Sequence, residues 1–247
     1  MKRAGLLPMV LLLALSSFAA TAKDVSYKSG DETVNGILYT PKGKGPFPAL
    51  IVIHEWWGLN DWVKEQASKL ADEGYVSLAI DLYRGKVATT PDMAHELMRG
   101  VPDDRADKDL HAAFEFLKSQ PDVKPEKIGA IGWCMGGGYS LDVALAEPTL
   151  AADVINYGHL ATEPDDLKKI HAPILGLFGG QDRGITPDDV KKFDDQLKAL
   201  GKKVDTHVYP DAGHAFENPN NTAGYRKDDA ADAWKRTVAF LAATLKK

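Results

Sequence analysis

Cysteine is almost absent from this 247-residue sequence, which contains only Cys134. A single cysteine excludes an intramolecular disulfide, so its thiol is either buried packing or a reactive group. An excess of positive charge is also missing, since 30 Lys and Arg stand against 35 Asp and Glu and the formal net charge is −5. Nucleic acids are bound by clustered Lys and Arg, so this balance argues against a nucleic-acid partner.

Long apolar runs are missing beyond the first 22 residues, so no later segment is expected to span a membrane. The first residues combine a basic start, an apolar stretch from Leu6 to Leu15 and an A-x-A cleavage site that ends at Ala22. The stretch is shorter than the about 20 residues that cross a bilayer, which favours a cleaved signal peptide at 1–22 over an uncleaved anchor. We expect a mature domain of residues 23–247 that is exported to the periplasm or secreted, without stable membrane association.

Apolar strands alternate with amphipathic helices along the rest of the chain. Strands are expected at 32–41, 47–55, 75–83, 127–133, 151–158, 172–180 and 204–210. Helices are expected at 61–74, 106–120, 135–147, 186–201 and 228–247. This alternation predicts the α/β class, with a mostly parallel central sheet, helices on both faces and a single domain.

Glycines frame Cys134 where an expected strand passes into an expected helix. Gly132, Cys134 and Gly136 form the pattern GxCxG. With serine at the centre, this pattern is the nucleophile elbow of the α/β-hydrolases, a sharp turn in which a Cβ at either flanking position would collide with its neighbours. The turn places the cysteine at a helix N-terminus, whose partial positive charge favours a thiolate. The pattern predicts an α/β-hydrolase fold with a cysteine nucleophile.

A candidate acid and a candidate base follow Cys134 in the order that this fold uses. Asp182 and His214 each lie in a glycine-containing loop directly after an expected strand. An aspartate or a histidine in such a loop is common and by itself indicates no catalytic role. In open α/β sheets, however, the ligand crevice lies at these strand ends. Together, Cys134, Asp182 and His214 predict a Cys–His–Asp triad. The backbone N–H groups of Met135 and Trp56 are expected to form the oxyanion hole.

A metal site is not expected. His54 and Glu55 begin an HExxH zinc pattern, but Gly58 stands where the second histidine is required, and the segment ends a strand. No organic cofactor is implied either. Among the other histidines, His159 ends an expected strand near the crevice and is a candidate substrate contact.

Short segments spread over the chain support a more specific interpretation. The elbow "GWCMGG" occurs together with "IHEWWGLN", "AIDLYRG", "GGQD" and "GHAF", and with them the sequence from 32 to 245 resembles the dienelactone hydrolase family. The resemblance implies ester or lactone hydrolysis with Cys134 as nucleophile, His214 as general base and later acid, and Asp182 orienting the histidine.

The resemblance also assigns a role to Glu55. It implies a carboxylate that keeps the resting thiol of Cys134 protonated and takes its proton when substrate arrives. A thiol kept neutral resists oxidation, because the thiolate is the reactive form. From the residues alone, Glu55 can equally be a buried structural carboxylate.

The residues expected to bind substrate depart from the family pattern. The dienelactone enzymes bind the substrate carboxylate with two arginines. Arg84 lies near the position of the first, but Asn218 occupies that of the second, four residues after the histidine of the triad. An asparagine cannot replace a bidentate, charged guanidinium. Trp57 and Tyr83 indicate a more apolar or aromatic pocket.

We therefore expect an exported, monomeric hydrolase of small-molecule esters or lactones that forms a thioester on Cys134 and uses no cofactor. One alternative is a true dienelactone hydrolase of aromatic degradation. A second is a catalytically silent binding protein of the same family. A redox role for the thiol ranks last, because no resolving cysteine is present.

Overall fold

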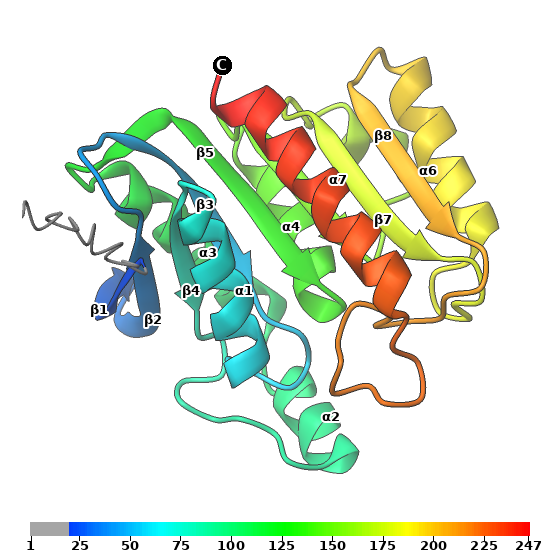
Figure 1. Ribbon diagram of the computed structural model, residues 1–247, viewed down its shortest axis with the longest axis horizontal. Helices are drawn as coiled ribbons and strands as arrows, with labels where there is room; N and C mark the ends of the chain where they lie inside the picture. The colour runs from blue at the N-terminus through cyan, green and yellow to red at the C-terminus, as the bar shows by residue number, and fades with distance from the viewer. Residues whose placement is uncertain (1–19) are drawn as a thin grey trace, which may run out of the picture.

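An eight-stranded sheet forms the centre of the computed structural model, which describes residues 20–247 (Figure 1). Its strands are β1 (Thr21–Ser29), β2 (Glu32–Thr40), β3 (Phe47–Ile53), β4 (Val76–Ile80), β5 (Val123–Trp133), β6 (Ala152–Asn156), β7 (Ile174–Gly179) and β8 (Val204–Tyr209). The strand order is β1-β2-β4-β3-β5-β6-β7-β8. From β4 to β8 all neighbours are parallel, whereas β1 and β2 are antiparallel additions at one edge. The prediction of a mostly parallel sheet is confirmed.

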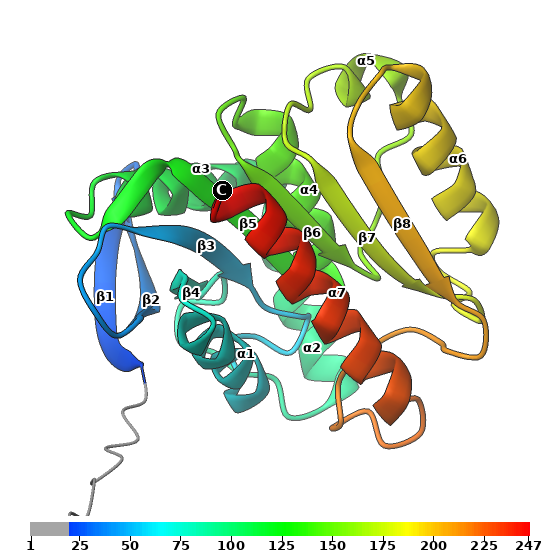
Figure 2. The ribbon, with the colours of Figure 1, turned by 45° about the horizontal axis from the view of Figure 1, so that its top comes forward.

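Helices cover both faces of the sheet, as predicted (Figure 2). The helices are α1 (Asp61–Asp72), α2 (Pro91–Arg99), α3 (Asp103–Lys118), α4 (Met135–Ala146), α5 (Pro164–Leu167), α6 (Pro187–Ala199) and α7 (Lys227–Leu245). Buried residues of α1 and α7 pack with one face. Those of α3, α4 and α6 pack with the other. The central strands are apolar on both faces because helices cover both.

Local sequence signals fix where the helices begin. The side chain of Asn60 accepts a hydrogen bond from the backbone N–H of Val63 and caps α1. At α6, Thr186 and Asp189 form a reciprocal capping box, and Pro187 occupies the first turn. Such caps satisfy N–H groups that have no partner within the helix. Helix α1 follows the carboxyl end of β3, and α6 follows that of β7. The loops that join these strands to their helices therefore lie at the carboxyl ends of the strands.

The predicted elements omit β1, α2 and α5. β1 is largely exposed and polar, and its first residues overlap the predicted signal peptide: Ala22, the predicted cleavage point, pairs with Tyr39 of β2. The apolar stretch of that signal lies outside the described residues, so the signal peptide stays a prediction. In residues 20–247 no helix has both the length and the apolar character that a membrane span requires.

Candidate active site

Cys134 lies at the turn between β5 and α4, with a φ of 56°. A side chain is strained in this left-handed region, and the close approach of neighbouring backbone explains the glycines around it. A Cβ on Gly132 would collide with the backbone of Gly136, and a Cβ on Gly136 would collide with the carbonyl oxygens of Ile53 and His54. The turn presents the thiol beyond the carboxyl end of the sheet, half-buried, at the N-terminus of α4.

His214 and Asp182 lie beside Cys134, each in a loop that follows a strand. The Nδ1 atom of His214 is 2.6 Å from Oδ2 of Asp182. The other carboxylate oxygen of Asp182 accepts hydrogen bonds from the N–H groups of Gly184, at 2.8 Å, and Ile185, at 3.2 Å. Burial of the aspartate opposes ionisation, but the hydrogen bonds from His214 and these N–H groups outweigh it and lower the pKa of Asp182. An ionised, oriented acid thus holds the imidazole.

The imidazole of His214 also interacts with Cys134. Burial lowers the pKa of His214, but hydrogen bonds with Asp182 and Cys134 and the charges of both partners outweigh burial and raise it to about 10. The raised pKa makes His214 a strong proton acceptor beside the cysteine. Tyr157 packs edge-on against the imidazole, with ring centroids 5.2 Å apart. The three residues predicted as a triad are brought together by β5, β7 and β8.

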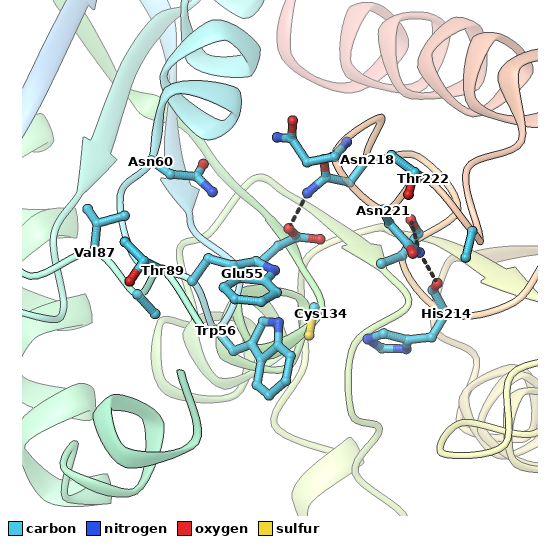
Figure 3. Close-up of a pocket in the computed structure, with 15 residues that line it drawn as sticks. Glu55, Trp56, Asn60, Val87, Thr89, Cys134, His214, Asn218, Asn221 and Thr222 are labelled. Atoms are coloured by element: carbon cyan, nitrogen blue, oxygen red, sulfur yellow. Dashed lines mark hydrogen bonds between the residues drawn. The ribbon is translucent and has the colours of Figure 1, made fainter. Parts of the chain in front are cut away.

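Glu55 lies directly after β3 and is buried, with 1% of its surface exposed. Its Oε2 accepts a hydrogen bond of 2.6 Å from Nδ2 of Asn218, and its Oε1 accepts one of 3.5 Å from the hydroxyl of Tyr157. Figure 3 shows the carboxyl group above Cys134 and directed toward Asn218. Burial raises the pKa of Glu55 to about 7, although both hydrogen bonds and the charge of His214 act against this. No hydrogen bond in the described chain joins Glu55 to Cys134, which is instead paired with His214.

The burial of Glu55 has a measurable consequence for stability. Because its pKa rises from 4.5 to about 7 on folding, the folded state favours the protonated form. The stabilisation is complete below about pH 4 and is lost as the pH rises through 7. We expect the unfolding free energy of the native protein, relative to Glu55→Gln, to fall by roughly 3 kcal/mol from pH 4 to pH 8.

Urea denaturation at a series of pH values measures this difference. The matched control is Glu65→Gln, which removes an exposed carboxylate paired with Lys69 on α1. Its difference from the native protein should change little over the same range. An equal pH dependence for both variants would show that burial of Glu55 is not the cause.

Two backbone N–H groups of residues that line a cavity together with Cys134 have no hydrogen-bond partner in the described chain. Within residues 20–247 no hydrogen bond occupies the N–H of Trp56 or Met135. The hydroxyl of Tyr83 donates to the carbonyl oxygen of Trp56 at 3.0 Å and lies 3.3 Å from the sulfur of Met135. Tyr83 thus ties together the two segments predicted to form the oxyanion hole. Tyr83 is 4% exposed and lines neither cavity beside Cys134, whereas the sequence placed it in the substrate pocket.

His54 links the ends of β3 and β4 beneath the same loop. Its Nδ1 lies 2.6 Å from the carbonyl oxygen of Glu55, and its Nε2 lies 3.3 Å from the N–H of Leu82. This arrangement requires a neutral imidazole that donates from Nδ1 and accepts at Nε2. Burial lowers the pKa of His54, which favours this neutral form. The histidine is structural, and the described residues contain no group of metal-ligating side chains.

A cavity of about 720 Å³ opens above the thiol, and we call it the amide pocket (Figure 3). Its lining includes Glu55, Trp56, Trp57, Cys134 and His214, together with the amide and hydroxyl side chains of Asn60, Thr89, Asn218, Asn220, Asn221 and Thr222. None of the lining residues is Lys or Arg. Trp57 lines this pocket, as predicted from the sequence.

A second cavity of about 710 Å³ meets the same cysteine, and we call it the α4 pocket. Trp56, Cys134 and Met135 lie at the end that it shares with the site, and Tyr139 and Asp142 of α4 extend it. His159, which is exposed, lines this cavity rather than the amide pocket. The nucleophile therefore faces two cavities, one on each side of Trp56.

Arg84 does not reach either cavity. Its guanidinium is 2.7 Å from Oδ2 of Asp109 on α3 and 2.8 Å from Oε2 of Glu32 on β2. Asp109 is fully buried, so this ion pair joins the sheet edge to α3, and moving the arginine would leave a buried charge without its partner. The structure thus places Arg84 in an ion pair outside both cavities, whereas the sequence predicted a contact with a substrate carboxylate. Asn218, noted in the sequence only as a missing arginine, proves to be the main partner of Glu55.

Comparison with known proteins gives a consistent result. A model of the dienelactone hydrolase family matches residues 34–245. Protein usf of Aquifex pyrophilus is 36% identical over 224 residues, which cover 88% of this chain and 96% of that protein. The structure of a dienelactone hydrolase-like promiscuous phosphotriesterase from metagenomic libraries has 27% identity and a TM-score of 0.85, covering 92% of this chain and 99% of that one.

A dienelactone hydrolase from Anabaena variabilis shares the fold, with 23% identity and a TM-score of 0.68 over 92% of this chain and all of its own. The family model extends over β3, the turn at Cys134 and the loops that carry Asp182 and His214, and the relative from Aquifex pyrophilus also covers most of the chain. The chain belongs to the dienelactone hydrolase family.

Proposed function

We propose that the protein hydrolyses small carboxylic esters or lactones that carry no carboxylate group, through a thioester formed on Cys134. The observation that carries the proposal is that Cys134 and His214, which is hydrogen-bonded to Asp182, line one cavity, and that the backbone N–H groups of Trp56 and Met135 have no partner. A nucleophile, a base, an oriented acid and an oxyanion site within one pocket are the parts that acyl transfer requires. Membership of the dienelactone hydrolase family supports a hydrolase.

The first half-reaction forms the acyl-enzyme. His214 takes the proton of the Cys134 thiol, and the sulfur attacks the carbonyl carbon of the ester. The N–H groups of Trp56 and Met135 stabilise the negative oxygen of the tetrahedral intermediate. His214 then gives its proton to the leaving oxygen as the C–O bond breaks, and the acyl group stays on sulfur as a thioester. Asp182 stabilises the imidazolium throughout.

The second half-reaction releases the acid. A water molecule enters from the amide pocket and gives a proton to His214 as its oxygen attacks the thioester carbon. The same two N–H groups hold the second oxyanion. The C–S bond breaks, sulfur leaves as thiolate, and the proton on His214 restores the thiol. No redox partner takes part in this cycle.

Glu55 is proposed as a second proton acceptor for the thiol. A carboxyl group with a pKa of about 7 can take or return a proton near neutral pH. Its hydrogen bonds with Asn218 and Tyr157 would fix the carboxyl group above the cysteine. These contacts give Asn218 a positioning role in place of substrate carboxylate binding.

The proposed preference for substrates without a carboxylate rests on the two positions expected to carry arginine. Asn218 bonds to Glu55, and Arg84 bonds to Asp109 and Glu32. The amide pocket contains the carboxyl group of Glu55 and no Lys or Arg, so a substrate carboxylate would lose its hydration there without gaining a cation. We also propose export and action as a monomer, supported for export by the layout of residues 1–22.

A substrate panel tests the proposed activity. We expect hydrolysis of p-nitrophenyl acetate and of the neutral lactone dihydrocoumarin well above the rate of the Cys134→Ala protein. Hydrolysis of 4-carboxymethylenebut-2-en-4-olide should have a kcat/KM at least about tenfold lower, because its carboxylate lacks a partner. A preference for that dienelactone would favour the true dienelactone hydrolase. Turnover no faster than that of Cys134→Ala on every substrate would favour the silent binding protein.

A further inference from the structure

The proposed reaction assigns no part of the substrate to the α4 pocket, although Cys134 lines this pocket too. Its wall is built from α4, the end of α2, the start of α3 and the segment that carries His159 and Asp166. At about 710 Å³ it equals the amide pocket in volume. A cavity of this size accommodates a small organic group, and the nucleophile stands at its inner end.

The position of His214 decides which part of the substrate faces which cavity. In the tetrahedral intermediate the leaving oxygen must accept a proton from His214, and this residue lines the amide pocket and not the α4 pocket. The oxyanion is held between Trp56 and Met135. The remaining substituent on the carbon is the acyl chain, and Met135 continues into the α4 pocket. The leaving group therefore belongs in the amide pocket and the acyl chain in the α4 pocket.

The charged side chains of the α4 pocket are mostly acidic. Asp103, Asp142 and Asp166 line it together with one cation, Arg99, which is exposed. Asp166 is paired with Lys169 at 2.7 Å. Within the described chain neither Asp103 nor Asp142 has an ion-pair partner. The pocket therefore offers two uncompensated carboxylates to whatever enters it.

Helix electrostatics account for one of these carboxylates but not for the other. Asp103 begins α3, where negative charge interacts favourably with the helix N-terminus. Asp142 lies beyond the first turn of α4, so its charge gains no such stabilisation from the helix N-terminus. Burial and the nearby charges of Asp107 and Asp103 raise the pKa of Asp142 to about 6, so it remains largely ionised at neutral pH. Burial and the neighbouring negative charges thus destabilise the ionised form of Asp142. A positively charged ligand in the pocket would offset this destabilisation.

We propose that the α4 pocket binds the acyl chain of the substrate, and that Asp142, assisted by Asp103, selects acyl chains that end in a cation over chains that end in an anion. This inference rests on the proposed function. It adds the chemical class of the acyl group, for which the amide pocket gives no indication. An acyl chain that ends in an ammonium group is the kind of substrate that the pocket would favour.

Three p-nitrophenyl esters of matched length test the proposal. Their acyl chains are 4-(trimethylammonio)butanoyl, the neutral isostere 5,5-dimethylhexanoyl and the anionic 4-sulfobutanoyl. We expect kcat/KM to decrease in this order, by about tenfold at each step at low ionic strength. In Asp142→Asn the ratio between the cationic and neutral esters should fall at least about threefold.

Matched controls separate the pocket from general charge effects. Asp188→Asn removes an exposed carboxylate of α6 that lines neither cavity, and it should leave all three rates unchanged. Acetylcholine and 3,3-dimethylbutyl acetate carry the same charge difference in the leaving group, and their ratio should not respond to Asp142→Asn. If that ratio responds and the acyl series does not, the assignment of the two cavities is reversed and the proposal fails.

The outcomes also distinguish this inference from the proposed function. Hydrolysis of the neutral ester that depends on Cys134, combined with equal rates for the three acyl chains, would overturn the acyl-chain proposal alone. Turnover of none of the esters above the rate of Cys134→Ala would overturn the proposed function, and the acyl-chain proposal with it.

Discussion

Replacing Cys134 with alanine is expected to lower kcat/KM for p-nitrophenyl acetate by about 10⁴-fold or more. Alanine removes the sulfur that attacks the ester and leaves only the oxyanion donors and the pocket to accelerate hydrolysis by water. The substitution should change the free energy of unfolding little, because the thiol is only half-buried. Alanine, like cysteine, has a Cβ, so the backbone strain at a φ of 56° is the same in both proteins. Steady-state kinetics, with the thermal unfolding midpoint measured alongside, check both parts.

Cys134→Ser is the second variant for this prediction. It keeps the approximate size of the side chain and one polar atom but replaces the thiol with a hydroxyl. The much higher pKa of the hydroxyl makes its proton harder for His214 to remove. We expect it to retain a small fraction of the native rate. A Cys134→Ala protein that keeps more than a tenth of native kcat/KM would show that hydrolysis occurs elsewhere.

His214→Gln is expected to lower kcat by about 10³-fold or more, because it removes both the base that activates the thiol and the acid that protonates the leaving oxygen. The loss should not add to that of Cys134→Ala in the double variant, since residues that act as a unit are strongly non-additive. His111→Gln is the matched control. His111 lies on α3 and pairs with Glu147, outside both cavities, so its replacement should leave kcat unchanged.

Additive losses in the Cys134→Ala and His214→Gln double variant would contradict a shared mechanism. Asp182→Asn gives a further check, because it keeps the size of the side chain while removing the charge that stabilises the imidazolium. Its kcat should fall, and the pKa of His214, followed by NMR titration, should drop below its value of about 10.

The residues around Cys134 could be predicted because short-range rules govern them. A turn that passes this close to neighbouring backbone requires glycine at positions 132 and 136, so the GxCxG pattern can be recognised in the sequence. The ends of parallel strands meet at one edge, so Asp182 and His214 could be placed near Cys134 from the order of strands alone. The α/β class followed from the same alternation, and the structure confirms it.

The partners of charged residues could not be predicted, because they depend on long-range packing. Asn218 and Glu55 are 163 positions apart and meet at 2.6 Å only after α7 and the loop before it have folded over the site. Arg84 was expected to bind substrate because it lies near the position of the first carboxylate-binding arginine of the family. Asp109, which pairs with it, lies on α3 and gives no local sign of facing the sheet edge. Contacts between residues so far apart in the sequence produce no local sequence pattern from which they could be predicted.

The edge of the sheet escaped prediction for a different reason. β1 pairs only with β2, so most of its side chains are exposed and polar and lack the apolar run that marks the central strands. The α4 pocket also has no local signature, since α2, α3, α4 and the loop at His159 each contribute a part.

The most direct test of the central claim is the intact mass of the protein during turnover. We predict that rapid acid quenching of the protein with p-nitrophenyl acetate traps a species heavier by one acetyl group. Proteolysis should place this group on the peptide that contains Cys134, and hydroxylamine should release it as it does other thioesters. The Cys134→Ala protein should show no such adduct. Rapid hydrolysis by the native protein with no acyl group on Cys134, or with the acyl group on another residue, would contradict the account.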